Sequence, residues 1–448
     1  MKIVIAGAGD IGFHLGKLLA NEQHDIVLID TNQEVLDYAH NHLDVQVLRG
    51  DATSINTLKQ AEVAEADLFL AVTTSESSNI VSSILAKKFG AEQTVARVSN
   101  GEFLEPFQRE IFQQLGIDKI FSPAKLAVME IERLIKLSEV TDIFEFENGK
   151  ITLLGISLDD DTPILNKSIE QITAKYKHLN FKPIAILRNN DTLIPRDKTI
   201  LLRGDHIYLI VTKEDIKKVL KNLGKKLVKV NNIMILSGGE IAIQTAKLLE
   251  NHYNVTIIDG DRNVCKRMAE ILHKSLIVKG DPSDIDLLKE EGLEEMDAFI
   301  ALTRNSETNI ITSLVAEEAG VFKTIAMVDN IVYTHISQSI GVDTLINKKL
   351  IAANNVFRFV RKGNVEAITS IHGVDAEIIE YAVSEGSVLT QKALKDLNFP
   401  KHALIGGVIR DDEAIIPAGD FQLRSGDKVI VFAMLESIGS VEKLFLVE

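Results

Sequence analysis

The sequence has no tryptophan, a single cysteine and only eight prolines among its 448 residues. One cysteine, Cys265, excludes an intramolecular disulfide and any metal site built from several thiolates. Basic side chains are also in deficit, with 49 lysines and arginines against 64 acidic residues and a formal net charge of −15. This balance argues against a nucleic-acid partner, which needs a basic surface, and against adhesion to anionic lipid.

Long hydrophobic runs are missing as well. No apolar stretch approaches the ~18 residues that a membrane-spanning helix requires. The N-terminus, MKIVIAGAGD, leads directly into a strand pattern and lacks the features of a signal peptide. We therefore expect a cytoplasmic protein without direct lipid insertion, whose attachment to any membrane depends on a protein partner.

What the sequence does contain is a double repeat. LLANEQHDIVLIDTN (18–32) matches LLENHYNVTIIDGD (248–261), and EADLFLAVTTSESSNIVSSILAKKFG (65–90) matches EMDAFIALTRNSETNIITSLVAEEAG (295–320). A second kind of segment, 185–220, resembles 407–444. The order is A-B-A′-B′, which indicates duplication of a two-domain unit rather than shared composition.

Each longer unit alternates short β-branched runs with amphipathic stretches, a pattern typical of βαβ units. We expect an α/β protein with two Rossmann-like doubly wound parallel sheets. A small α+β domain, with short strands joined by turn residues, follows each sheet. The predicted boundaries are 1–123 and 231–350 for the Rossmann-like domains, 124–141 and 351–366 for helical linkers, and 142–224 and 367–448 for the small domains.

The first unit carries a dinucleotide-binding fingerprint. Gly7, Gly9 and Gly12 complete a G-x-G-x-x-G between the strand KIVIA and a helix pattern, and Asp30 ends the next strand. The glycines would allow a tight turn, close approach of a pyrophosphate and close helix packing, unless they serve the turn alone. Asp30 would accept hydrogen bonds from ribose and would repel a 2′-phosphate, which favours NAD(H). The predicted loop residues are Gly7, Ala8, Gly9, Asp10, Ile11 and Gly12.

Other strand ends should complete this pocket, because ligands lie at the carboxyl ends of parallel strands. Asp51 and Ala52 follow the third strand and would flank the adenine. Thr73 and Thr74 follow the fourth and would meet phosphate or ribose. Arg97, in the fifth, would offer a cation to a phosphate, with a surface salt bridge as the alternative interpretation.

The second copy of the fingerprint is altered. Ser237 and Ala242 stand where the first copy has its first and third glycines, and Met327 replaces the arginine. We expect weaker or different binding there, and the sequence leaves open whether this site is occupied. The retained positions are Gly239, Asp259, Asp281 and Thr303.

Catalytic and metal-ligating patterns are not evident. The histidines show no ligand spacing with carboxylates or the cysteine, so we predict no metal. The small domains offer no concentrated acid/base constellation, so we predict no catalytic residues. The alternative function is an NAD-dependent oxidoreductase.

The segments GAGDIG, LIDTN, GDATS, AVTTSESSN and ARVSN, in the A-B-A′-B′ order, resemble the RCK (KTN) regulators of potassium channels and transporters. The resemblance covers essentially the whole chain. It implies RCK N-terminal and C-terminal domains, with NAD(H), and in relatives ATP or ADP, as ligands. It also implies a homo-oligomeric ring, a tetramer for tandem chains, attached to the inner face of the cell membrane through a potassium-translocating subunit.

Overall fold

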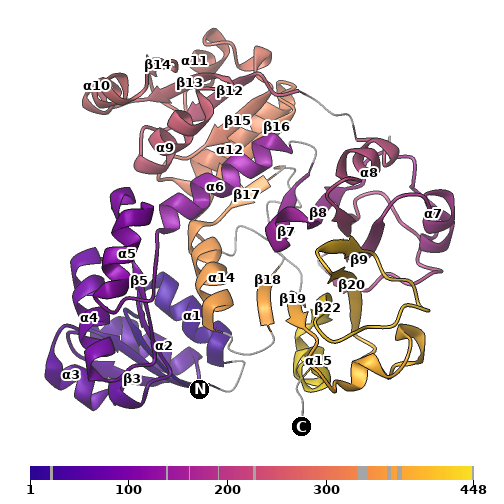
Figure 1. Cartoon of the computed structure of the whole chain (residues 1–448). Coiled ribbons are helices and arrows are strands. Elements are labelled where there is room, and N and C mark those ends of the chain that lie inside the picture. The colour runs from indigo at the N-terminus through magenta and orange to yellow at the C-terminus, as the bar shows by residue number, and fades with distance from the viewer. Residues whose placement is uncertain are drawn as a thin grey trace. The chain divides into compact units, whose positions relative to one another are not determined.

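The computed structural model describes residues 1–20, 24–137, 140–160, 162–189, 191–225, 229–330, 342, 344–360, 365–370 and 376–445. The chain forms two compact units (Figure 1). Residues 1–129 and 347–360 make the first unit, and residues 130–346 and 361–448 make the second.

The first unit contains a six-stranded parallel sheet in the order β3-β2-β1-β4-β5-β6. The order reverses between β1 and β4, which creates the crevice where Rossmann-like sheets bind ligands. Residues 3–6 of β1 have no exposed surface, as expected for a parallel sheet covered on both faces. The strands are β1 (Lys2–Ala6), β2 (Asp25–Asp30), β3 (Gln46–Arg49), β4 (Leu68–Ala71), β5 (Gln93–Arg97) and β6 (Lys119–Phe121).

One of the helices of the first unit comes from far along the chain. Helix α14 follows the last strand of the second parallel sheet in sequence, yet it packs against α1. Periodicity alone predicts a helix there but not its packing partner. The helices are α1 (Asp10–Ala20), α2 (Gln33–His42), α3 (Ile55–Gln60), α4 (Glu76–Phe89), α5 (Pro106–Gln114) and α14 (Lys348–Val360), and α6 (Pro123–Lys136) begins here.

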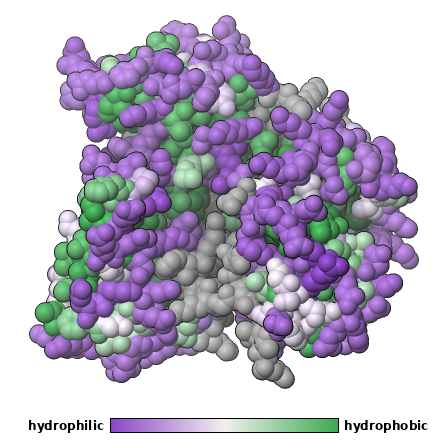
Figure 2. Space-filling model, in the orientation of Figure 1, coloured by the Kyte–Doolittle hydropathy of each residue, from purple (hydrophilic) through white to green (hydrophobic). Residues whose placement is uncertain are grey.

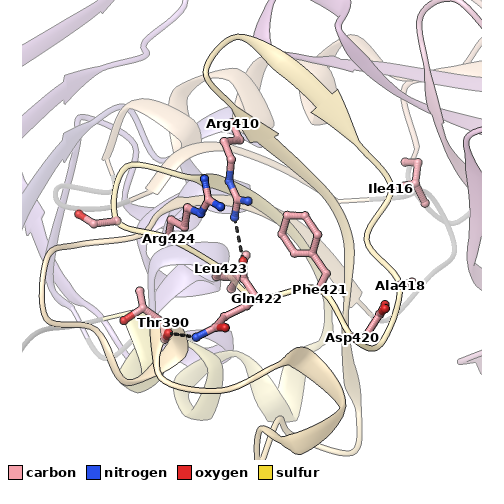
Figure 3. Close-up of a pocket in the computed structure, with 10 residues that line it drawn as sticks. Thr390, Arg410, Ile416, Ala418, Asp420, Phe421, Gln422, Leu423 and Arg424 are labelled. Carbon is pink, nitrogen blue, oxygen red and sulfur yellow. Dashed lines mark hydrogen bonds between the residues drawn. The ribbon is translucent and has the colours of Figure 1, made fainter.

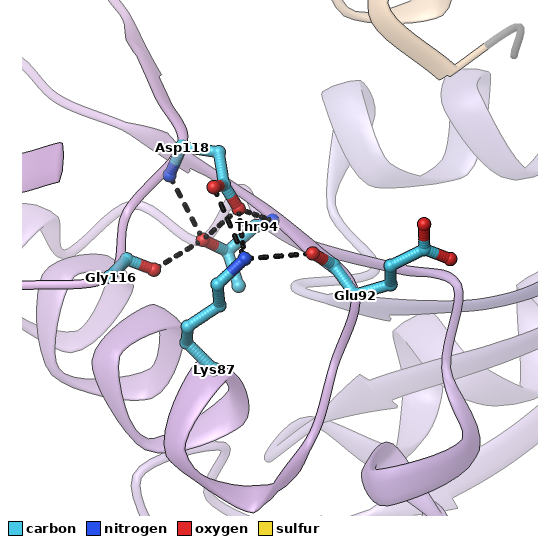
Figure 4. Close-up of polar contacts among 5 residues, drawn as sticks. All are labelled: Lys87, Glu92, Thr94, Gly116 and Asp118. Carbon is cyan, nitrogen blue, oxygen red and sulfur yellow. Dashed lines mark hydrogen bonds and ion pairs between the residues drawn. The ribbon is translucent and has the colours of Figure 1, made fainter.

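A polar cluster anchors the amino ends of β5 and β6 (Figure 4). The Lys87 ammonium from the end of α4 donates to Asp118 at 2.9 Å and to the Glu92 carbonyl at 2.7 Å. The Asp118 carboxylate also accepts from the Thr94 backbone N–H at 2.8 Å, and the Thr94 hydroxyl donates to the Gly116 carbonyl at 2.8 Å. These bonds fix one helix end and two strands at the edge of the sheet opposite to the crevice.

The second unit repeats the parallel sheet in the order β14-β13-β12-β15-β16-β17. Its strands are β12 (Asn232–Leu236), β13 (Asn254–Asp259), β14 (Leu276–Lys279), β15 (Ala298–Ala301), β16 (Lys323–Met327) and β17 (Thr344–Ile346). Its helices are α9 (Glu240–Leu249), α10 (Arg262–Ile271), α11 (Ile285–Glu290) and α12 (Ser306–Glu318).

The second unit also holds two five-stranded antiparallel sheets, ordered β10-β9-β11-β8-β7 and β18-β19-β22-β20-β21. They share one hydrophobic core that includes Ile184 and Tyr208 of the first sheet and Ile378 and Phe432 of the second. The strands are β7 (Asp142–Phe146), β8 (Ile151–Ser157), β9 (Phe181–Arg188), β10 (Asp191–Leu193), β11 (His206–Thr212), β18 (Val365–Ser370), β19 (Ala376–Ala382), β20 (Ala403–Arg410), β21 (Glu413–Ile415) and β22 (Lys428–Met434). The helices are α7 (Ile169–Lys175), α8 (Ile216–Asn222) and α15 (Ile438–Phe445).

The same ion pair closes a turn in both small domains. Arg188 binds Asp205 through two hydrogen bonds of 2.7 and 2.6 Å, and Arg410 binds Asp427 through bonds of 2.8 and 2.7 Å. The predicted fold class, two Rossmann-like sheets each followed by a small α+β domain, is thus confirmed. No helix in the described ranges is long and apolar enough to cross a bilayer.

Candidate nucleotide-binding site

The predicted residues of the first unit meet at the carboxyl edge of its sheet. The glycine loop joins β1 to α1, Asp30 ends β2, and Arg97 ends β5. Asp51 and Ala52 follow β3, and Thr73 and Thr74 follow β4. The strand order therefore brings all five strand ends to one edge, as the βαβ pattern predicts.

Glycine is favoured at the three positions of the loop for different physical reasons. Gly7 has a φ of +103°, and a Cβ there would lie 2.8 Å from the Thr73 nitrogen. A Cβ on Gly12 would lie 1.7 Å from the Gly7 carbonyl oxygen, so helix and loop can approach only without it. A Cβ on Gly9 would meet nothing within 4 Å. Gly7 and Gly12 are thus explained by the local geometry of this loop, whereas the space beside Gly9 is open to a ligand.

Asp30 holds the glycine loop against the end of β2. Its Oδ2 accepts from the Ala8 N–H at 2.8 Å, and its Oδ1 accepts from the Asn32 N–H at 2.9 Å. The carboxylate remains partly exposed. Each oxygen has a second lone pair, so the group can still accept hydrogen bonds from ribose hydroxyls.

Asp51 and Ala52 differ in what they present. The Asp51 carboxylate accepts from the backbone N–H and from the hydroxyl of Thr53, both at 2.8 Å, and these bonds lower the pKa of Asp51. Asp51 is exposed and charged at the rim of the site. Ala52 is buried and packs into the core of the sheet.

A buried asparagine that the sequence analysis missed fixes two strand ends. Asn79, only 1% exposed, accepts from the Thr73 N–H at 2.9 Å and from its hydroxyl at 2.7 Å. Its amide donates to the carbonyls of Thr73 at 3.1 Å and Arg97 at 2.9 Å. The signal was in the repeat, because Asn309 occupies the same position and makes the same bonds to Thr303 and Met327.

Two cations converge on the acidic residue that begins α1. Burial lowers the pKa of Arg97, and the nearby Asp10 carboxylate opposes this effect. Within the described ranges the Arg97 guanidinium donates no hydrogen bond, so its donors can face a ligand. The Lys349 ammonium, from α14, lies 2.7 Å from Asp10 Oδ2. Two cationic side chains therefore lie near the start of α1, where a diphosphate would find oppositely charged partners.

The loop of the second copy keeps the positive φ of the first at its first position. Ser237 has a φ of +98°, a conformation that side chains rarely adopt. Its hydroxyl accepts from the Gly239 N–H at 3.1 Å. In the first copy the matching N–H, that of Gly9, has no acceptor among the described residues.

The other predicted residues of the second copy keep their places. Asp259 accepts from the Gly238 N–H at 2.6 Å, as Asp30 does from Ala8. Asp281 accepts from the backbone N–H and hydroxyl of Ser283 at 2.9 and 2.8 Å, which lowers the pKa of Asp281. Met327, at the place of Arg97, is buried and brings no charge.

A cavity of about 870 Å³ lies elsewhere, in the second small domain (Figure 3). Arg410 lines it, but its guanidinium is bound to Asp427 and to the Gln422 carbonyl and lies over the Phe421 ring. None of the predicted nucleotide-binding residues lines this cavity. Among the described residues no group of three or more His, Cys, Asp or Glu side chains could hold a metal ion.

Comparison with known proteins matches these units to two domain families. The TrkA-N domain matches residues 3–123 and 233–348, and the TrkA-C domain matches residues 153–224 and 378–446. Trk system potassium uptake protein TrkA homolog 2 of Methanosarcina mazei is 32% identical, covering 99% of this chain and all of the relative. Trk system potassium uptake protein TrkA of Haemophilus influenzae is 30% identical, covering 99% of this chain and 98% of the relative.

Solved structures share the fold at low sequence identity. The crystal structure of the GsuK RCK domain is 16% identical with a TM-score of 0.61, covering 99% of this chain and 94% of that one. The GsuK channel bound to NAD gives the same identity and TM-score, covering 99% of this chain and 78% of that one. With both domain types matched twice and relatives aligned over their full length, the chain belongs to the TrkA family of tandem TrkA-N/TrkA-C (RCK) proteins.

Proposed function

We propose that this chain is the regulatory, nucleotide-sensing subunit of a potassium uptake system. It binds NAD(H) at the carboxyl edge of its first sheet and gates a Trk-type potassium-translocating membrane subunit. The assignment of this ligand rests on the glycine loop. The Gly9 N–H and the Arg97 guanidinium are without acceptors in the described part of the chain and lie at one strand edge with Asp30.

The choice of nucleotide follows from Asp30. Its carboxylate sits at the end of β2, where Rossmann-like sheets hold the adenosine ribose. A 2′-phosphate there would meet a negative charge, so NADH should bind better than NADPH. ATP and ADP lack that phosphate and fit the same adenosine and phosphate contacts. The GsuK channel, which has the same fold, has been solved bound to NAD.

An oxidoreductase is the alternative that the fingerprint alone would allow. The relatives are named for potassium uptake, not for a redox reaction, and the chain aligns with them over its full length. The domains that follow the parallel sheets are β-rich and share a core with one another. The chain is therefore a regulator and not an enzyme.

Assembly into a homotetrameric ring is part of the proposal. On the surface of the first unit, hydrophobic residues show in the region of α4 and α5 (Figure 2). Phe107, Ile111 and Leu115, spaced four residues apart, are 70%, 41% and 43% exposed, and Val81 of α4 is 45% exposed. Such a spacing puts side chains on one face of a helix, and an exposed apolar face favours contact with another subunit.

Substitution of Gly9 by Asp tests the ligand assignment. A Cβ at Gly9 meets nothing within 4 Å, so the fold should persist, while a carboxylate would oppose the diphosphate. Calorimetric titration of the full chain with NADH should show the high-affinity binding lost in Gly9→Asp. The control, Gly439→Asp, places the same side chain at an exposed glycine of α15 with equally open space and should bind as the unaltered chain does. Equal titration curves for Gly9→Asp and the unaltered chain would refute the assignment.

A further inference from the structure

Helix α14 delivers a lysine to the first nucleotide site. The buried Asn347 caps this helix, since its side-chain oxygen accepts from the N–H groups of Lys349 at 3.0 Å and Leu350 at 3.2 Å. The cap fixes the first turn, and the packing of α14 against α1 fixes the helix. From this turn the Lys349 ammonium reaches Asp10 Oδ2 at 2.7 Å.

Asp10 stands where a diphosphate would approach. It follows Gly9 directly and is the first residue of α1, whose free N–H groups and positive end attract anions. Its side chain is 71% exposed, whereas that of Lys349 is only 20% exposed. A bound diphosphate would bring negative charge beside the Asp10 carboxylate. The two anions would then compete for the same ammonium group.

We propose that Lys349 senses the phosphates of the bound nucleotide. When the site is empty, the Lys349 ammonium pairs with Asp10. When nucleotide is bound, the ammonium turns toward the diphosphate, and this contact links α14 to the ligand. Helix α14 continues directly from β17 in the chain. Nucleotide binding at the first site therefore acts on a segment that belongs to the second repeat. This inference rests on the proposed nucleotide-binding function.

The repeat carries different residues at the positions that match Lys349 and Asp10. Ala124 stands at the position that matches Lys349, three residues after the end of the strand. Glu240 takes the place of Asp10, and its carboxylate accepts from the Gln244 amide at 2.8 Å within the same helix. The residues that match Lys349 and Asp10 in the repeat therefore do not reproduce this lysine–carboxylate pair.

Two single substitutions separate sensing from a structural role. Lys349→Ala leaves Asp10 uncompensated beside the phosphates, so it should weaken NADH and ADP binding by about tenfold, the scale of one charge-assisted contact. Asp10→Asn removes the repulsion and releases the lysine, so NADH and ADP binding should tighten. If the ion pair only held α14 in place, both substitutions would weaken binding. Lys17→Ala, an exposed lysine on α1, is the control with the same change in charge.

Hydrogen exchange of α14 gives the second readout. At saturating NADH the amides of this helix should exchange more slowly in the unaltered full chain, and this protection should be lost in Lys349→Ala. The inference is overturned if Lys349→Ala binds like the control, if Asp10→Asn does not tighten binding, or if α14 is protected equally in Lys349→Ala. Failure of the unaltered chain to bind either nucleotide would instead overturn the proposed function together with the inference built on it.

Discussion

Ser237 keeps the backbone conformation of the glycine that it replaces. Its φ of +98° is close to the +103° of Gly7, although a side chain in such a conformation costs about 1–3 kcal/mol. The hydroxyl then accepts from the Gly239 N–H, the donor that a phosphate would require. One serine thus both strains the loop and occupies its donor.

Ser237→Gly should therefore restore binding at the second site. The test uses the full chain with Gly9→Asp, so that the first site is silent. Adding Ser237→Gly should raise the affinity for NADH at least several-fold, measured by calorimetric titration. Ser237→Ala, which frees the donor but keeps a side chain at positive φ, separates the two effects. If neither substitution raises the affinity for NADH, Ser237 does not limit binding at the second site.

Asp30→Ala should weaken NADH binding for two reasons. The ribose loses its acceptor, and the Ala8 N–H loses the carboxylate that holds the loop. We expect an affinity loss of roughly tenfold, worth about 1.4 kcal/mol, and a smaller difference between NADH and NADPH. Competition titrations with both nucleotides measure this. Equal binding of NADH and NADPH by the unaltered chain would contradict the role given to Asp30.

At the scale of elements, the Lys87–Asp118 cluster should stabilise the first sheet without touching the site. Asp118→Ala removes the acceptor of the Lys87 ammonium and of the buried Thr94 N–H. The free energy of unfolding of this unit should fall by about 1–3 kcal/mol. NADH affinity should not change, because the cluster lies at the amino ends of the strands. Urea unfolding gives the first quantity and titration the second.

Asp44→Ala is the matched control for this prediction. Asp44 is exposed, so its replacement should change stability by no more than about 0.5 kcal/mol. A loss of stability equal to that of Asp118→Ala would mean that the cluster contributes nothing specific.

The helices and strands also show which features of the fold and of the site could be predicted from the sequence. Strands, helices and the carboxyl-edge site follow from the period of apolar residues and from the glycine spacing, which are local. Asn79 could have been found, because the repeat retains it as Asn309. Lys349 could not, because its place beside Asp10 depends on packing between helices remote in the chain. The positive φ of Ser237 could not be predicted from the sequence either, because a serine at a glycine position can either keep or change the turn.

At the scale of the whole molecule, membrane association should depend on a protein. The net charge of −15 opposes binding to anionic lipid, and none of the described helices could cross a bilayer. In cells that lack the pore subunit, the protein should move from the membrane fraction to the supernatant. Binding to protein-free anionic liposomes would contradict this, and liposomes that carry the pore subunit serve as the positive control.

The placement of α14 has a consequence for synthesis. Helix α1 ends at Ala20, whereas α14 begins at Lys348. At the usual rate of 5–20 residues per second, roughly 15 to 65 seconds of translation separate the two. Until then the nascent N-terminal domain leaves the ribosome with the α14-facing side of α1 uncovered and with Asp10 lacking its Lys349 partner. A messenger RNA truncated after the first repeat would yield an N-terminal domain that lacks α14.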